Sequence, residues 1–167
     1  APPAAGGELM FSVAPQLIDA IVVAARDAMP YVHVSDGFAA SSDVADTLMI
    51  GVDDPNVDGA QYGVDSERDL VNGGLDGMVA ETGTIVCAAM SWVGDLNGAK
   101  TVRDRVYGIA DQLAELCRIR GGTDPAFGVE RAMWTVCGRG GTQLLQWPGD
   151  RGVAALLIFR IYYEGRP

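Results

Sequence analysis

One stretch of the sequence, VAALLIFRIYY over residues 153–163, is apolar at almost every position. Its β-branched and aromatic residues favour a strand, and successive side chains of a strand point to opposite faces of a sheet. Arg160 is the single charged residue of the stretch, so both faces of this strand are apolar. Such a strand lies inside a sheet that is covered on both sides. We therefore expect helices against one face and a second protein or layer against the other.

The rest of the chain predicts two helices and further strands. Apolar residues at helical spacing predict a first helix over residues 14–28, and a second that begins near Asn97 or Thr101 and ends at Gly121 and Gly122. Apolar runs bounded by turn residues predict strands over residues 32–34, 46–52, 78–92, 131–137, 142–147 and 152–163. We expect the strands over 46–52 and 78–92 to pair as a hairpin with a very large tip, and the last three strands to be antiparallel neighbours. The fold class is therefore α+β, with two main helices packed on a largely antiparallel or mixed sheet of five to six strands.

The length of 167 residues fits one domain. We assign residues 11–167 to it and residues 1–10, which are rich in Pro, Ala and Gly, to an extended arm. No apolar run reaches the roughly 18 residues of a membrane span, and the start lacks the pattern of a secretory signal. We expect a protein that has no membrane association and is made in a cytoplasm.

Most of the net charge of −10 comes from residues 43–81, which hold ten acidic side chains and one basic side chain, Arg68. Many Gly residues and few apolar ones within this window predict a long solvated loop over residues 53–77. Loops of that length inside a compact domain are often functional. This loop is therefore a candidate contact region.

The composition argues against several kinds of chemistry. With Lys100 as its only lysine, the chain has no basic stripe for tight binding to nucleic acid. The one histidine, His33, belongs to no recognisable nucleophile motif, so we expect neither an enzyme nor a cofactor. Cys87, Cys117 and Cys137 lack metal or redox spacing and are expected to be buried thiols.

One short motif suggests calcium. The sequence DPNVDG matches the opening of a calcium-binding loop, with oxygen donors at Asp54, Asn56 and Asp58. The twelfth position is Asp65, whose side chain is shorter than the usual Glu, and the flanking segments do not predict two helices. A solvated turn is the favoured interpretation, and a calcium-dependent binding module is an alternative.

The order of the segments resembles that of a known family. The chain contains SVAPQLIDAIVVAAR, then IGVDDP, GTIVCAAMSW, VRDRVYGIADQLAELCR and finally ALLIFRIYYEGR. In this order it resembles the tail terminator, or tail completion, proteins of long-tailed bacteriophages (siphophages) that infect actinobacteria. The resemblance covers residues 11–166 and includes no catalytic signature.

The resemblance implies a structural protein of the virion. Six copies would form a ring on the end of the tail tube, stop its polymerisation and join the tail to the head connector. The implied partners are other copies of the chain, the major tail tube protein and a head-completion or connector protein, while DNA passes through without tight binding. The implied location is the head-proximal end of the tail, after assembly in the host cytoplasm. A head-to-tail stopper or adaptor, or a minor tail protein, is the alternative within virion assembly.

A ring needs two different patches that meet on adjacent copies. We expect an interface around the apolar last strand and around Trp147, which stands beside Pro148. The residues assigned to this ring or tube interface are Trp147, Phe159, Arg160, Tyr162 and Arg166. The edge strands over residues 32–34 or 142–147 could extend pairing between copies. Like charge on the wall of a tube prevents DNA from sticking, so we expect these acidic residues to face the lumen: Asp53, Asp54, Asp58, Asp65, Asp69 and Asp76.

Overall fold

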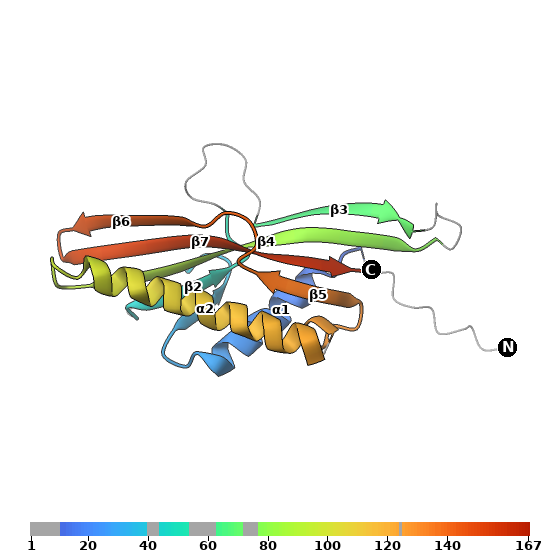
Figure 1. The fold of residues 1–167 in the computed structure, drawn as a ribbon, viewed down its shortest axis with the longest axis horizontal. Helices are drawn as coiled ribbons and strands as arrows, with labels where there is room; N and C mark the ends of the chain where they lie inside the picture. Colours follow the sequence, from blue (N-terminus) through green and yellow to red (C-terminus); the bar gives the residue numbers. More distant parts are fainter. Residues whose placement is uncertain (1–10, 40–43, 54–62, 72–76, 124) are drawn as a thin grey trace.

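The computed structural model describes residues 11–39, 44–53, 63–71, 77–123 and 125–167. Within them, two α-helices lie on one side of a seven-stranded, mostly antiparallel sheet (Figure 1). This confirms the predicted α+β class, with one strand more than the upper limit of the prediction. In chain order the elements are α1 (Ala14–Ala28), β1 (His33–Asp36), β2 (Asp46–Ile50), β3 (Val64–Leu70), β4 (Val79–Val93), α2 (Ala99–Thr123), the 3-10 helix η2 (Pro125–Gly128), β5 (Ala132–Cys137), β6 (Gln143–Gly149) and β7 (Gly152–Gly165).

The sheet is built around two long central strands, β4 and β7. They pair in antiparallel register from Glu81 with Gly165 to Val93 with Val153. Two shorter strands lie end to end along each outer side of this pair: β3 and β2 along β4, and β5 and β6 along β7. One end of the sheet, the β3–β5 end, therefore has the order β3-β4-β7-β5. The other end, the β1–β6 end, has the order β1-β2-β4-β7-β6, with β1 parallel to β2.

The predicted antiparallel pairing of the strands over 46–52 and 78–92 is confirmed by β2 and β4. The predicted hairpin with one large tip is only partly right, because β3 lies between these strands in the chain and also pairs with β4. The prediction that the last three strands are neighbours holds only in part. Both β5 and β6 pair with β7, but they occupy successive lengths of the same side and do not pair with each other. Helix α2 also continues through Gly121 and Gly122 to Thr123, two residues before Pro125.

The prediction of one acidic loop over residues 53–77 is wrong for residues 64–70, which form β3. Every residue of β3 after Val64 is exposed, so no apolar alternation marks the strand. Backbone pairing with β4, from Val64 opposite Ile85 to Leu70 opposite Val79, holds it instead. Charged side chains are typical of edge strands because they discourage uncontrolled pairing.

The helices cover what we call the inner face of the sheet. The inner side chains of β7 alternate along the strand and are at most 8% exposed. They are Val153, Ala155, Leu157, Phe159, Ile161 and Tyr163, and they share one core with the apolar faces of α1 and α2. Cys87 and Cys117 are buried in this core as predicted, whereas Cys137, which was also predicted to be buried, is only partly buried. Burial raises the pKa of Cys87 well above its usual value, and a hydrogen bond with Cys137 together with burial raises that of Cys117, so both thiols stay protonated.

Hydrogen bonds to a buried carboxylate connect the start of α1 to the sheet. Glu81 on β4 is fully buried and accepts hydrogen bonds from Ser12 Oγ at 2.6 Å, from the Val13 backbone N–H at 3.0 Å and from the Tyr163 hydroxyl at 2.9 Å. Burial, and then the hydrogen bond to Glu81, raise the pKa of Tyr163. Gly83 makes room for this ring, since a Cβ there would lie 2.7 Å from the Tyr163 hydroxyl.

Candidate assembly surfaces

The outer face of the sheet, opposite the helices, carries a second apolar cluster. It contains Met49, Val52, Val86, Ala88 and Ile158, all at most 8% exposed, with Ala39, Met90 and Leu156 packed against them. The sequence prediction that both faces of the last strand are apolar is therefore matched by two separate clusters, one on each side of β7.

Towards the β1–β6 end, large apolar side chains of the outer face are open to solvent. Trp92 on β4, Ala154 on β7 and Trp147 on β6 are direct neighbours across the strands. Trp92 is 42% exposed, Trp147 39% and Leu145, also on β6, 42%. We call Trp92, Leu145, Trp147 and the intervening Met90, Ala154 and Leu156 the tryptophan patch. Exposed apolar groups that gather on one face are typical of protein contact sites.

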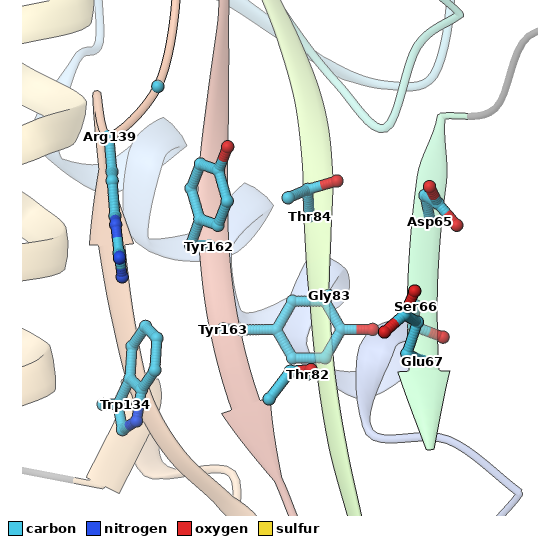
Figure 2. Close-up of a pocket in the computed structure, with 11 residues that line it drawn as sticks. Asp65, Ser66, Glu67, Thr82, Gly83, Thr84, Trp134, Arg139, Tyr162 and Tyr163 are labelled. Carbon is cyan, nitrogen blue, oxygen red and sulfur yellow. The ribbon is translucent and has the colours of Figure 1, made fainter. Parts of the chain in front are cut away.

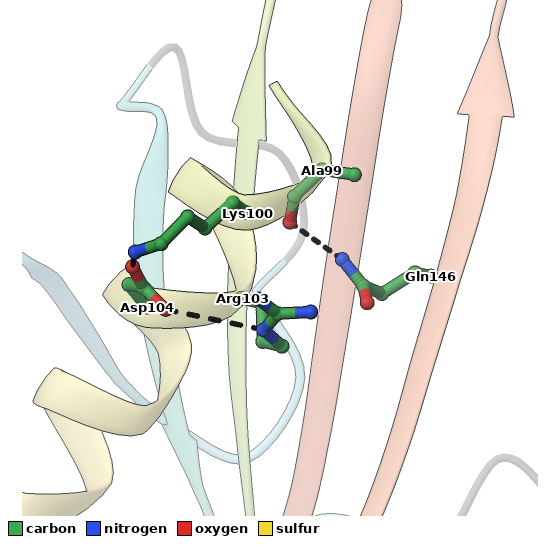
Figure 3. Close-up of polar contacts among 5 residues, drawn as sticks. All are labelled: Ala99, Lys100, Arg103, Asp104 and Gln146. Atoms are coloured by element: carbon green, nitrogen blue, oxygen red, sulfur yellow. Dashed lines mark hydrogen bonds and ion pairs between the residues drawn. The ribbon is translucent and has the colours of Figure 1, made fainter. Parts of the chain in front are cut away.

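The strand that presents this patch is held from its inner side. Gln146 of β6 donates a hydrogen bond from Nε2 to the Ala99 carbonyl oxygen at the start of α2, at 2.7 Å (Figure 3). In the same turn of α2, Asp104 pairs with Lys100 and, at 3.9 Å, with Arg103. The hydrogen bond from Lys100 lowers the pKa of Asp104. Since Gln146 and Trp147 point to opposite faces, Trp147 stays available on the outer side.

A polar groove lies at the β3–β5 end. Asp65 and Glu67 on β3 stand on one side of it, and Trp134 of β5 and Arg139 just after β5 stand on the other (Figure 2). The groove has a volume of about 540 Å³, and its floor is formed by Thr82, Gly83, Thr84 and Tyr162. Its two sides thus carry opposite charges.

Two contacts order the β5 side of the groove. Trp134 donates a hydrogen bond from Nε1 to Glu164 Oε2 at 2.8 Å. The guanidinium group of Arg139 lies over the Tyr162 ring, 5.8 Å from its centre. A cation above an aromatic face is favourable, so Arg139 stays beside the groove although it is exposed.

The residues predicted for a ring or tube interface do not form one site. Trp147 belongs to the tryptophan patch, and Tyr162 lies on the floor of the polar groove. Arg160 is on the outer face between them, where its Nη1 lies 3.4 Å from the Gly141 carbonyl oxygen. Arg166 is exposed after the end of β7, and its backbone N–H donates to the Arg131 carbonyl oxygen at 2.8 Å.

The assignment of Phe159 to the interface is wrong. Its side chain is 1% exposed and belongs to the core beneath the helices. The alternation of side chains along β7 explains this position, because Ile158 and Arg160 on either side of it face outwards.

The acidic residues fall partly within the described segments. Asp53 is exposed, and Asp65 and Asp69 are exposed on β3. Asp54, Asp58 and Asp76 lie outside the described residues, as does Asn56, so three of the four suggested calcium ligands are not placed. Among the residues that the structure describes, no group of three or more His, Cys, Asp and Glu side chains is arranged to hold a metal ion.

His33, the one histidine, is exposed at the start of β1. Across the described part of the chain, no helix is long and apolar enough to cross a membrane.

Sequence reasoning missed the polar groove, including Glu67, Trp134 and Arg139. Its residues come from four strands and from the segment just after β5, and β5 lies near β3 and β4 only because β7 pairs with both β4 and β5. One signal was present: Asp65, Glu67 and Asp69 alternate with Ser66 and Arg68, and a period of two indicates a strand with one acidic face.

No protein-family model matches this chain, and no curated protein matches its sequence.

Proposed function

We propose that this protein is a structural subunit of a phage virion that forms a ring on the end of the tail tube. In that position it stops polymerisation of the tube and joins the tail to the head connector. The proposal combines the resemblance over residues 11–166 with one structural observation, the exposed tryptophan patch. It includes no enzymatic activity and no cofactor.

The tryptophan patch supports assembly for an energetic reason. Burial of apolar surface contributes roughly 25 cal/mol for each Å² removed from water, and aromatic side chains dominate many interfaces. Trp92 and Trp147 flank the small Ala154. Trp92 and Ala154 also line a hollow of about 420 Å³ beside the β6–β7 turn. A side chain from another protein can enter this hollow and remove the Trp92 ring from water, and a partner that covers the rest of the patch would also bury Trp147.

The proposed partners follow from the position at the end of a tube. They are other copies of the chain in a six-membered ring, the major tail tube protein on one side and a head-completion or connector protein on the other. DNA passes through the ring without tight binding, which agrees with the net charge of −10. The proposed location is the head-proximal end of the tail, with assembly in the host cytoplasm.

The test is to measure native masses of the purified chain alone and mixed with the tail tube protein, and to measure tube lengths by electron microscopy. We expect a ring-sized species and tubes that no longer grow when the chain is added. The Leu145→Asp variant should lose both effects, because it places a charge in the tryptophan patch. Leu96→Asp is the matched control, since Leu96 is also exposed but lies outside the sheet, before α2.

A chain that stays monomeric and leaves tube growth unchanged would contradict the proposal. A ring that binds the head connector but ignores the tube would instead identify a stopper or adaptor.

A further inference from the structure

The β3 side of the sheet carries negative charge that is not compensated locally. Asp65, Glu67 and Asp69 are exposed on β3, and their cross-strand partners on β4 are Thr84, Thr82 and Ala80. None of the three carboxylates forms an ion pair with another described residue. Arg68, between them, points to the inner side, where it donates to the Phe11 carbonyl oxygen and lies over the Phe11 ring.

The opposite side of the same end carries an excess of positive charge. Arg131 precedes β5, Arg139 follows it, and Arg166 lies beside its start. None of these arginines forms an ion pair with another described residue. Two carboxylates of the described residues stand nearby, the exposed Glu130 and Glu164, which accepts a hydrogen bond from the neutral Trp134 indole and keeps its charge. The three arginines therefore still outnumber the carboxylates on this side.

Both outer strands also have backbone groups available for pairing. In the described sheet, β3 pairs only with β4, and β5 pairs only with β7, so each is an edge strand. The free side of an edge strand can pair with a strand of another chain.

We propose that the β3 edge of one copy docks against the β5 edge of the next copy. This inference depends on the proposed ring, and it names the surfaces that would close it. Docking places Asp65, Glu67 and Asp69 near Arg131, Arg139 and Arg166 of the adjacent copy, so charges unpaired in one subunit find partners between subunits.

The charges also select the type of contact. Two β3 edges against each other would bring like charges together, and so would two β5 edges, which is unfavourable between paired strands. The contact must therefore join two different edges. Repetition of such a contact produces a closed ring or a filament, and not a twofold dimer.

A charge-swap experiment tests this pairing. Asp65→Lys with Glu67→Lys makes the β3 edge basic, and Arg131→Glu with Arg139→Glu makes the β5 edge acidic. We expect each variant alone to need at least about ten times more protein for assembly than the wild type, because both of its edges then carry the same sign. An equimolar mixture of the two variants should assemble again, because every contact in an alternating ring is complementary.

The control is Asp19→Lys with Asp27→Lys, which makes the same charge change at two exposed positions on α1. It should assemble like the wild type. Native mass spectrometry or analytical ultracentrifugation gives the readout, and circular dichroism checks that each variant is folded.

The outcomes separate this inference from the proposed function. If the wild type forms rings and the charge-reversed variants do so equally well, the edge pairing is wrong while the ring remains. If both variants disperse but their mixture does not reassemble, the two edges do not contact each other. A wild-type chain that is monomeric at every concentration, with and without tube protein, overturns both proposals.

Discussion

The two faces of β7 are similarly apolar in sequence but differ in what covers them. On the inner face, alternate residues from Val153 to Tyr163 are buried beneath the helices. On the outer face, Ile158 is fully buried, whereas Ala154, Leu156, Arg160 and Tyr162 keep part of their surface in water. The inner face therefore contributes mainly to stability, and the outer face has apolar area left for contacts with other proteins.

A pair of leucine substitutions tests the difference between the two faces most directly. Leu157 faces inwards and is 1% exposed, whereas Leu145 faces outwards on β6 and is 42% exposed. Leu157→Ala should lower the free energy of unfolding by about 2–5 kcal/mol, because it leaves a cavity in the core. Leu145→Ala should cost less than about 1 kcal/mol. Urea denaturation measures both, and equal losses would show that the outer face is as tightly packed as the inner one.

A second comparison uses two glutamates. The carboxylate of Glu81 accepts three hydrogen bonds inside the protein, and that of Glu164 accepts one from Trp134 on the outer face. Glu81→Gln should lower the free energy of unfolding by about 1–3 kcal/mol, because an amide N–H₂ would face a donor. In Glu164→Gln the amide oxygen can still accept the single bond, so the loss should be smaller. Thermal unfolding of both variants measures the two losses of stability. A larger loss for Glu164→Gln than for Glu81→Gln would contradict this account.

Tyr163 on the inner face and Tyr162 on the outer face should also differ in how they affect the dependence of stability on pH. Burial and the hydrogen bond to Glu81 raise the pKa of Tyr163 in the folded state above the value of 10.0 expected in the unfolded chain. The unfolded state therefore loses this proton first as the pH rises, so the stabilisation is complete below about pH 10 and decreases above it. Tyr163→Phe should make the stability curve flatter above pH 10.

Tyr162→Phe, which removes a hydroxyl on the outer face, is the control for that experiment. Denaturant titrations from pH 8 to pH 11 provide the measurement. A wild-type curve that matches the Tyr163→Phe curve throughout would exclude the predicted linkage.

The smallest effect is expected at the solvent-exposed side of α2. Asp104 on α2 is exposed, and its ion pairs with Lys100 and Arg103 lie in water. Exposed ion pairs contribute little because solvent screens them. Asp104→Asn should leave the midpoint of urea denaturation unchanged within error. A clear shift of the midpoint would mean that these exposed ion pairs contribute more to the free energy of unfolding than solvent screening allows.

The sequence predicted the parts of the fold that depend on local periodicity. Helix α1 has the predicted bounds, and strands β2, β4 and β7 lie within two residues of theirs, because apolar spacing follows directly from burial. Strand β3 could not be recognised in the same way, since it depends on backbone pairing with β4 and has almost no apolar side chains.

The candidate surfaces were harder to predict than the fold. Trp147, which was predicted for an interface, is exposed on the outer face, and its role in an interface stays a prediction. Phe159 was assigned to the same interface because the apolar run alone does not say which alternate residues face the helices. The polar groove depends on which strands become neighbours, and that order is a property of the whole sheet.

The central place of β7 has a consequence for how the chain folds. Its long partner strand, β4, is distant in sequence: Glu81 of β4 and Tyr163 of β7, which share a hydrogen bond, are 82 positions apart. Contacts between distant segments cost chain entropy before they add stability, so topologies of this kind reach the native state slowly. Until β7 docks, β5 and β6 have no strand partner, and one side of β4 is unpaired. Partly structured species would therefore expose unpaired apolar strands. We therefore expect a single late cooperative step, and a need for protection against aggregation while the polypeptide is being made.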